Sequence, residues 1–551
     1  MGKKTRDSLV MQAAVLAAAG IISRIIGLLY RSPLTSAIGA AGNGYYSSAY
    51  YIYTIVLLIS SYSIPSAVSK IIASRLAVKE YRNAHRVFRC ALLYVLIVGT
   101  IGAAVLFFGA SALARQEGCI PAIKIFAPTV LIYGPLGVLR GYFQAHKSMV
   151  QTSISQIMEQ IVNAVASVGF AYLFIGMVKA DATISMADLP DREAVWGAAG
   201  SAVGTGMGVV MGLLVMLGMY LLNRRIIMNR VQKDKHHNVS PYTEIFKEIT
   251  LLVTPFILST AIYNLSSVVN SQIYQGSYKW VEGAVKDTVN ETFGLFSAQA
   301  MTISTIPIAF ASAMAAAMIP SITESITSKL FDDAKAKIAL AVKTTMIISI
   351  PSAVGIGVLA KPIILLLFPR TTPEELDIAG KVLVVLSLSV VFFALSTLNN
   401  SILQGIGRVN TPVVNAAIAL VIQTVILVGL LKFTNLGIYS VAIVNLVYSG
   451  VLSFLNQFFV GRELGYKQEF KRTFGSPLLA SAIMGLAAWG TYQALYAVTL
   501  SMRISVIPAI IVAVVFYFAA LLIFNGLTEE ELRSIPKGHL IVKVAKKCKL
   551  L

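Results

Sequence analysis

Long apolar stretches separated by short polar segments dominate this chain. A helix needs about 20 mostly apolar residues to cross the hydrocarbon of a bilayer, and in lipid the backbone groups of each span must bond to one another. The pattern therefore predicts an all-α integral membrane protein. Its fourteen expected transmembrane helices are 8–30, 45–76, 87–112, 120–143, 150–177, 195–223, 245–274, 290–320, 337–360, 378–403, 411–432, 436–460, 476–498 and 503–525.

Composition supports this class. The 551 residues are 56% hydrophobic and only 13% charged, whereas soluble domains are about 25% charged. The net charge of +20 does not indicate nucleic acid, because the basic residues form short clusters between the apolar stretches. Cys90, Cys119 and Cys548 are far apart and have no His or Cys at ligand spacing. We therefore expect no disulfide framework, metal site or cofactor.

The distribution of basic residues predicts the orientation. With the N-terminus in the cytoplasm, thirty of the 45 Lys and Arg residues fall on the cytoplasmic side, including Arg140 at the end of the fourth span and Lys147 after it, and twelve on the outer side. This is the bias of the positive-inside rule. We expect a multi-pass protein of the bacterial cytoplasmic membrane with both termini inside and lipid contacts at the basic tail.

Two landmarks recur along the chain and indicate an internal duplication. Ile64-Pro65-Ser66 returns as Ile319-Pro320-Ser321, and Leu139-Arg140-Gly141 as Leu403-Gln404-Gly405, at offsets of 255 and 264. Six helices repeated as six, with two more at the end, would give parallel repeats that bind cargo between them and alternate access. The expected parts are lobe 1–223, basic cytoplasmic linker 224–243, lobe 244–460, two extra helices in 461–525 and tail 526–551.

Two arginines stand in or beside the first span. Arg24 lies well inside it, where a cation costs about 2.5–3.5 kcal/mol, so it is expected to face a cavity or a partner. Receiving an anion such as a pyrophosphate would explain it, and so would snorkelling or an intrahelical pair. Arg31 follows seven residues later on the same face, one residue past the expected helix end. It either extends the basic strip or anchors the outer interface.

Uncharged polar residues and one carboxylate mark further candidates. Gln151, Ser155, Glu159 and Asn163 recur every four residues on the fifth span, so this face lines a cavity or packs on polar partners. Glu159 could also bind a proton or sodium ion, which would couple transport to an ion gradient or the membrane potential.

Similar stripes on the seventh and tenth spans include Asn264 and Asn399. For these two stripes, hydrogen bonding between helices is the simpler interpretation. The tyrosines that open the second span, at an outer helix end, indicate an aromatic belt or a sugar-stacking surface: Tyr45, Tyr46, Tyr50, Tyr51 and Tyr53.

Several catalytic signatures are missing from the sequence. It has no glycine-rich phosphate loop ending in Gly-Lys-Ser/Thr, no HExxH pair and no loop much longer than twenty residues between the expected spans. The chain is therefore expected to be a transporter and not an enzyme, with no ATP motor. The sequence leaves the energy source and the oligomeric state open.

The sequence resembles the MurJ-type lipid II flippases, and more closely the polysaccharide-biosynthesis and stage V sporulation protein B branch. Both belong to the multidrug/oligosaccharidyl-lipid/polysaccharide (MOP) exporter superfamily, which includes the MATE transporters. The resemblance covers about 1–525. It rests on the 6+6+2 plan and on Ser23-Arg24-Ile25-Ile26-Gly27, Tyr30-Arg31, Ile38-Gly39 and Pro65-Ser66-Ala67-Val68-Ser69-Lys70.

The resemblance implies flipping of an undecaprenyl-pyrophosphate-linked cell-wall precursor such as lipid II, with Arg24 and Arg31 meeting the pyrophosphate. The chain departs from MurJ proteins at two places. Tyr30-Arg31 stands where an Arg-Asp pair is usual, and Ala300-Met301-Thr302 stands where the eighth helix usually has an arginine. Its cavity is thus expected to be less basic. The alternatives are another lipid-linked oligosaccharide as cargo, or a MATE-type drug/cation antiporter, which Glu159 would suit.

Overall fold

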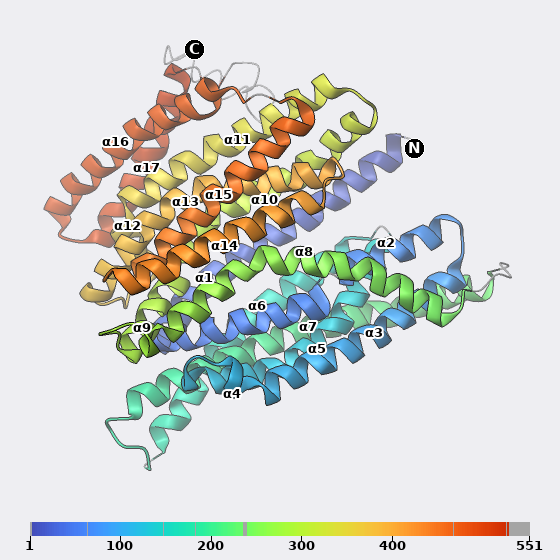
Figure 1. The fold of residues 1–551 in the computed structure, drawn as a ribbon, viewed down its shortest axis with the longest axis horizontal. Coiled ribbons are helices and arrows are strands. Elements are labelled where there is room, and N and C mark those ends of the chain that lie inside the picture. Colours follow the sequence, from blue (N-terminus) through green and yellow to red (C-terminus); the bar gives the residue numbers. More distant parts are fainter. Residues whose placement is uncertain are drawn as a thin grey trace. The chain divides into compact units, whose positions relative to one another are not determined.

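The computed structural model describes residues 3–62, 64–146, 148–181, 183–234, 240–466, 468–524 and 526–527, without the side chains of 3–17, 61, 62, 66, 252–263, 316–321 and 327. The described residues form helices joined by turns and bends, with no strand. Their contacts divide the chain into two compact units, Met1–Gly294 and Leu295–Leu551. Figure 1 colours the chain from blue to red in sequence order.

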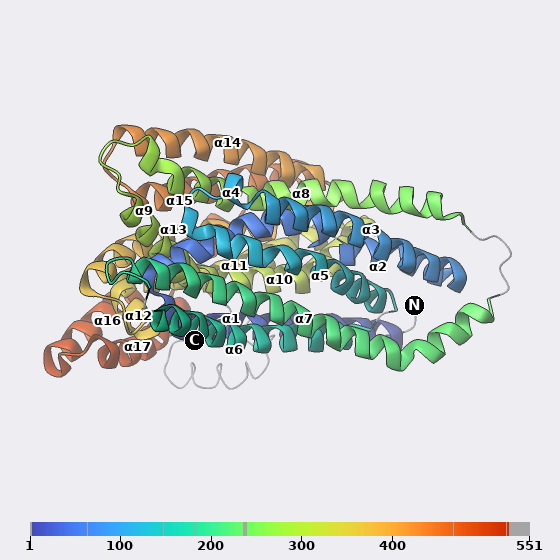
Figure 2. The same cartoon turned by 90° about the horizontal axis from the view of Figure 1, so that it is seen from below.

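The first unit is built from long helices with short helical turns between them. Its long helices are α1 (Lys3–Leu57), α3 (Tyr81–Phe108), α5 (Ile120–Ala145), α6 (Val150–Ala180), α7 (Leu189–Gln232) and α8 (Tyr242–Gly276). Its shorter elements are η1 (Leu58–Tyr62), α2 (Ile64–Ala77), α4 (Ala110–Leu113), η2 (Glu117–Cys119), η3 (Ser277–Lys279) and α9 (Lys286–Gly294). Figures 1 and 2 show α6 and α7 side by side along much of their length.

The second unit begins with the π-helical turn η4 (Leu295–Ala300). Its helices are α10 (Met301–Thr327), α11 (Phe331–Val358), α12 (Ala360–Leu367), α13 (Pro373–Gly405), α14 (Asn410–Phe433), α15 (Ile438–Leu464), α16 (Ser476–Thr499) and α17 (Met502–Ile523), with η5 (Lys471–Gly475) before α16. Helix α13 starts at a capping box: the Glu375 backbone N–H donates to the Thr372 hydroxyl, and the Thr372 N–H donates to the Glu375 carboxylate. These bonds satisfy backbone donors that a helix start otherwise leaves free.

Eleven candidate membrane spans are found among the described residues by length and composition, which confirms a multi-pass helical membrane protein. The predicted number of fourteen is not established by this count. The stretches not among the eleven are 8–30, 45–76 and 245–274, and each includes side chains that lie outside the described residues.

Helix α1 differs from the prediction of a span that ends at residue 30. It continues as helix, with Pro33 inside it, and breaks at Gly39, where φ is 67° and ψ is −175°. Glycine tolerates this left-handed φ because it has no Cβ, and the Asn43 side chain donates to the Gly39 carbonyl at 2.7 Å just after the break. Arg31 therefore lies within the helix and not beyond its end.

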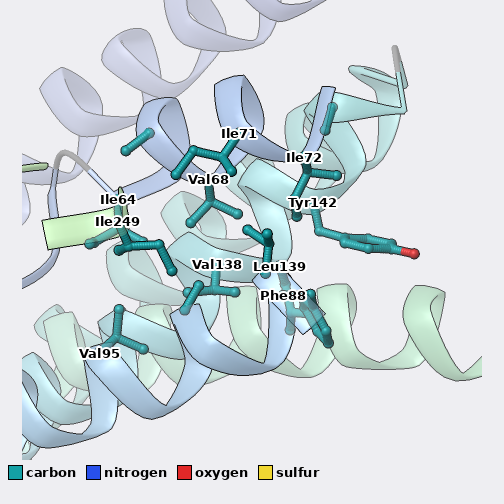
Figure 3. Packing of buried hydrophobic residues seen from close by; sticks show 14 of the residues in the cluster. Ile64, Val68, Ile71, Ile72, Phe88, Val95, Val138, Leu139, Tyr142 and Ile249 are labelled. Atoms are coloured by element: carbon teal, nitrogen blue, oxygen red, sulfur yellow. The ribbon is translucent and has the colours of Figure 1, made fainter. Parts of the chain in front are cut away.

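Two apolar clusters form the core of the first unit. One joins α2, α3 and α5 with one end of α8, through residues that include Val68, Phe88, Leu139 and Ile249 (Figure 3). The other surrounds Phe126 of α5 and the second part of α1. Burial of such side chains stabilises a fold by roughly 1.5–3 kcal/mol each relative to water. In a membrane protein, however, tight packing is the larger part of the effect.

The division into units does not follow the predicted linker 224–243. Helix α7 continues to Gln232, so the first part of that segment is helical. Helices α8 and α9 follow the linker in sequence, yet both pack against α1 inside the first unit. The lobes inferred from the internal duplication remain a prediction.

Candidate functional site

The two predicted arginines lie on one continuous part of α1. Arg24 is exposed, beside the exposed apolar side chains of Ile21 and Ile25. Arg31 is half-buried, and the groups that act on it electrostatically are tyrosines: Tyr30, Tyr46, Tyr50 and Tyr51. Neither arginine has a hydrogen bond or an ion pair with any side chain that the structure describes. Of the carboxylates that the structure describes, none therefore competes with an anion for these two guanidinium groups.

The tyrosine row of α1 is packed inside the protein. Tyr53 stacks on Phe126 with ring centroids 4.5 Å apart, and Tyr46 lies 6.0 Å from the same ring. The hydroxyl of Tyr45 donates to the Asp191 carboxylate at 2.7 Å, although Tyr45 is itself buried. For Tyr45, Tyr46 and Tyr53 the aromatic-belt interpretation is therefore wrong. Their burial also leaves them no free ring face for a sugar.

The polar face of α6 meets a buried cation from α5. The Arg140 guanidinium donates to the Glu159 carboxylate at 2.7 Å and to the Ser155 hydroxyl at 2.8 Å. Ser155 in turn donates to the Gly212 carbonyl of α7 at 3.2 Å. The side chains of Arg140 and Glu159 are only 7% and 15% exposed. This bonding neutralises the Glu159 carboxylate, the acidic candidate on the fifth predicted span.

Arg140, which the sequence counted with the cytoplasmic basic residues, is not a surface residue. It lies in the last turns of α5 and is buried between helices, so it cannot meet lipid headgroups. The reason is the carboxylate one helix away: a buried Arg is tolerated when an acid and a hydroxyl satisfy its donors. Sequence reasoning missed the pair, although the basic and acidic residues fall in consecutive predicted spans.

Four glycines of α7 let α6 approach closely. A Cβ added to Gly204 would lie 2.1 Å from the Ser167 backbone nitrogen, and one added to Gly208 would lie 2.7 Å from the Glu159 carbonyl oxygen. The set repeats every four residues: Gly200, Gly204, Gly208 and Gly212. Small residues at this spacing are a sequence signal for close helix packing in membranes, and the sequence analysis did not use it.

The other predicted residues of the first unit lie at different places on α6 and α8. Asn163 is buried, faces Gly208 and accepts from the Ser167 hydroxyl at 2.8 Å. Gln151, at the start of α6, accepts from the hydroxyl of Ser148. Asn264 is exposed on α8.

Asn399 belongs to the second unit. It is fully buried on α13, and its amide donates to the Gln457 carbonyl of α15 at 2.9 Å. This is the interhelical hydrogen bond expected of an uncharged stripe. Of the candidates, the structure thus brings together Ser155, Glu159 and Asn163, all in helix packing.

A close contact joins α9 to the second part of α1, and we call it the α1–α9 seam. A Cβ on Gly44 would lie 2.2 Å from the Asn290 carbonyl oxygen, and one on Gly294 would lie 2.0 Å from the Ala40 carbonyl oxygen. The Asn290 amide donates to the Ala41 carbonyl at 2.9 Å. Backbone therefore packs directly on backbone, and no larger residue fits at either glycine.

Buried amides continue this seam towards α8 and η2. The Gln275 amide donates to the Ser48 hydroxyl at 2.9 Å, and the Gln116 amide donates to the Gln275 side-chain carbonyl at 2.5 Å. At the more exposed end, the Arg115 guanidinium donates to the Gln272 side-chain carbonyl at 2.8 Å. By the predicted orientation all of these residues lie on the outer side. Apart from Arg115 the network is uncharged, so separating its members would not leave a buried charge without its partner.

Comparison with known proteins gives a consistent family. The sequence pattern of the family described as lipid II flippase MurJ matches residues 81–507. The chain is 25% identical to the lipid II flippase MurJ of Bacillus subtilis (strain 168) over 494 residues, covering 86% of each chain. It is 22% identical over 545 residues to stage V sporulation protein B of the same organism, covering 96% of this chain and 98% of that protein.

Solved structures show the same fold. The structure of a lipid II flippase MurJ in an inward closed conformation covers 91% of this chain and 98% of its own, with a TM-score of 0.65 and 14% identity. An inward-facing MATE multidrug transporter of the MOP superfamily covers 82% and 94%, with a TM-score of 0.56 and 18% identity. At these sequence identities, the structural similarity shows the fold and not the cargo.

Proposed function

This chain belongs to the lipid II flippase MurJ family, a family of transporters and not of enzymes, and on that basis we propose that it flips a polyprenyl-pyrophosphate-linked cell-wall precursor. The most direct cargo is lipid II, carried from the inner to the outer leaflet by alternating access. Its relatives named for lipid II flipping and for sporulation support a lipid-linked glycan over a soluble solute.

The observation that carries the proposal is the pair of arginines on α1, which have no acidic partner among the described side chains. Arg24 is exposed and Arg31 is half-buried among tyrosines. A pyrophosphate offers several anionic oxygens, and Arg binds such groups through two parallel N–H···O bonds. A guanidinium held near the membrane interior without a counter-charge is costly, so its presence there is best explained by a charge that arrives with the cargo.

Helix α1 also links the arginines to the α1–α9 seam. The arginines precede the break at Gly39 and the seam follows it. In the proposed cycle, the closed seam blocks the predicted outer side while the headgroup binds from inside. Release outward would require α1 and α9 to separate, which breaks neutral amide bonds worth about 0.5–1.5 kcal/mol each. Such bonds can open and close without a large barrier from ion desolvation.

The MATE-type antiporter alternative depends on a carboxylate available to a cation or a proton. Glu159 was the candidate for that role, but Arg140 binds it at 2.7 Å in a buried setting. A drug or sodium ion would have to displace this guanidinium. Among the described residues, the arrangement therefore favours an anionic cargo over a cationic one.

The test is exposure of lipid II on the outer leaflet of cells depleted of this protein and re-expressing single variants. We expect wild type to restore exposure and Arg24→Ala to fail while reaching the membrane at the normal level. Arg225→Ala is the matched control, since it removes an exposed arginine that lies near the C-terminal end of α7 and not on α1. Full rescue by Arg24→Ala would refute the anion-binding argument. Unchanged exposure on depletion would refute lipid II as the required cargo.

A further inference from the structure

A cavity of about 540 Å³ lies where α6 ends and α7 begins. Its apolar part includes Phe174 and Met177 from α6 and Trp196 from α7, with the Phe174 and Trp196 rings 6.1 Å apart in an edge-to-face arrangement. The size is within the range of small-molecule sites, roughly 300–1,000 Å³. No part of the proposed transport path uses this cavity.

The opposite wall of the cavity carries charges of both signs. Asp181 and Asp188 line it together with Arg192, and all three are exposed. Hydrogen bonds from the Thr183 hydroxyl and backbone N–H hold the pKa of the Asp181 carboxyl below its usual range, so it is anionic at neutral pH. Arg192 and Asp188 form no ion pair with any described side chain. A cation and two anions are thus available to a ligand at one small site.

The position of the cavity indicates a membrane surface. It opens at the ends of two helices that are long and apolar enough to span a bilayer, which is where lipid headgroups lie and where Trp is enriched. Its apolar side continues into exposed apolar residues of α6: Met177 is 54% exposed and Leu173 is 53% exposed. An acyl chain could extend from the cavity along this apolar face. A free sugar has no apolar chain for such a face to bind.

We propose that this cavity binds the headgroup of a phospholipid that carries both a phosphate and an ammonium group. Arg192 would pair with the phosphate, and Asp188 and Asp181 would take the ammonium. The glycerol and upper acyl region would contact Phe174 and Trp196. By the predicted orientation the lipid is one of the outer leaflet, and it would act as a bound structural lipid. The inference does not depend on which cargo the protein carries.

The test titrates the purified full-length protein with phosphatidylethanolamine or phosphatidylglycerol of identical acyl chains and counts bound lipids by native mass spectrometry. Exposed ion pairs contribute about 0.2–1 kcal/mol, so we expect wild type to bind the ethanolamine lipid up to about fivefold more tightly. Asp188→Asn should abolish this preference, whereas Arg192→Ala should weaken the binding of both lipids, since both carry the phosphate. Lys179→Ala is the control, because Lys179 is nearby but pairs with Glu193 at 3.3 Å outside the cavity lining.

Three results would overturn the proposal. One is equal binding of the two lipids by wild type, and another is a preference that survives Asp188→Asn or a lipid affinity that Arg192→Ala leaves unchanged. The third uses protein in which Trp280→Phe and Trp489→Phe leave Trp196 as the single tryptophan. Saturable quenching of its fluorescence by a soluble N-acetylglucosamine disaccharide, without effect of the lipid, would assign the cavity to a saccharide. Melting temperatures of the variants verify that they are folded.

Discussion

The Arg140–Glu159 pair allows a quantitative test of what the α6 carboxylate does. Because both side chains are largely buried, removing one partner leaves an uncompensated charge, and such changes cost about 3–5 kcal/mol. Replacing both residues with apolar ones of similar volume is often nearly neutral. We therefore expect Glu159→Met and Arg140→Met each to destabilise the protein by about 3 kcal/mol, and the double variant by far less than the sum.

The assay is thermal unfolding of the purified protein in detergent, followed for wild type, both single variants and the double variant. For domains of about 150–250 residues, 1 kcal/mol shifts the melting temperature by about 2–4 °C, so each single variant is expected to melt roughly 6 °C lower. Lys179 and Glu193 supply a matched surface pair, 57% and 26% exposed. Glu193→Met should cost no more than about 1 kcal/mol.

The outcome separates two roles for Glu159. If Glu159→Met melts with wild type, or if the two single effects simply add, the pair does not stabilise the packing of α5 on α6 as argued. In that case the carboxylate would again be a candidate for ion or proton binding. If the double variant regains stability and still transports, a coupling role for Glu159 is excluded.

Two further predictions concern glycines at close contacts. Gly204→Ala should force α6 and α7 apart and destabilise the protein by about 1–3 kcal/mol, whereas Gly218→Ala, with nothing within 4 Å, should not; equal melting curves would contradict the packing argument. Gly44→Ala should prevent closure of the α1–α9 seam and reduce lipid II exposure in the depletion assay, whereas Gly169→Ala on α6, also with open space around it, keeps the seam intact. Normal exposure with Gly44→Ala would show that transport does not require this contact.

Helix identity and the polar face of α6 could be predicted because each depends on local pattern alone. Apolar length determines that a segment must be helical in lipid, and a four-residue spacing places side chains on one face whatever that face meets. The sequence predicted that the α6 face either lines a cavity or packs on polar partners. For Ser155 and Glu159 the structure shows the second alternative. The spacing of the α7 glycines was equally readable and would have favoured packing.

The partners of these residues could not be predicted, because periodicity gives the face of a helix and not the helix that covers it. Arg140 illustrates this: near the end of an apolar stretch, it has the same local pattern as a cytoplasmic anchor. Only the contact with Glu159 distinguishes the two cases. The predicted end of the first helix was wrong for a related reason, since Pro33 is compatible with a helix here and the break falls at Gly39.

The charges left after this pairing constrain the cargo more than any single motif does. The Glu159 carboxylate is neutralised by Arg140, while Arg24 and Arg31 meet no acid among the described side chains. Among the described side chains, α1 therefore carries two arginines without a carboxylate partner, and α1 is the helix that also forms the seam with α9. A cationic drug would add to that repulsion. A pyrophosphate would relieve it, and would do so on the helix whose movement the proposed cycle requires.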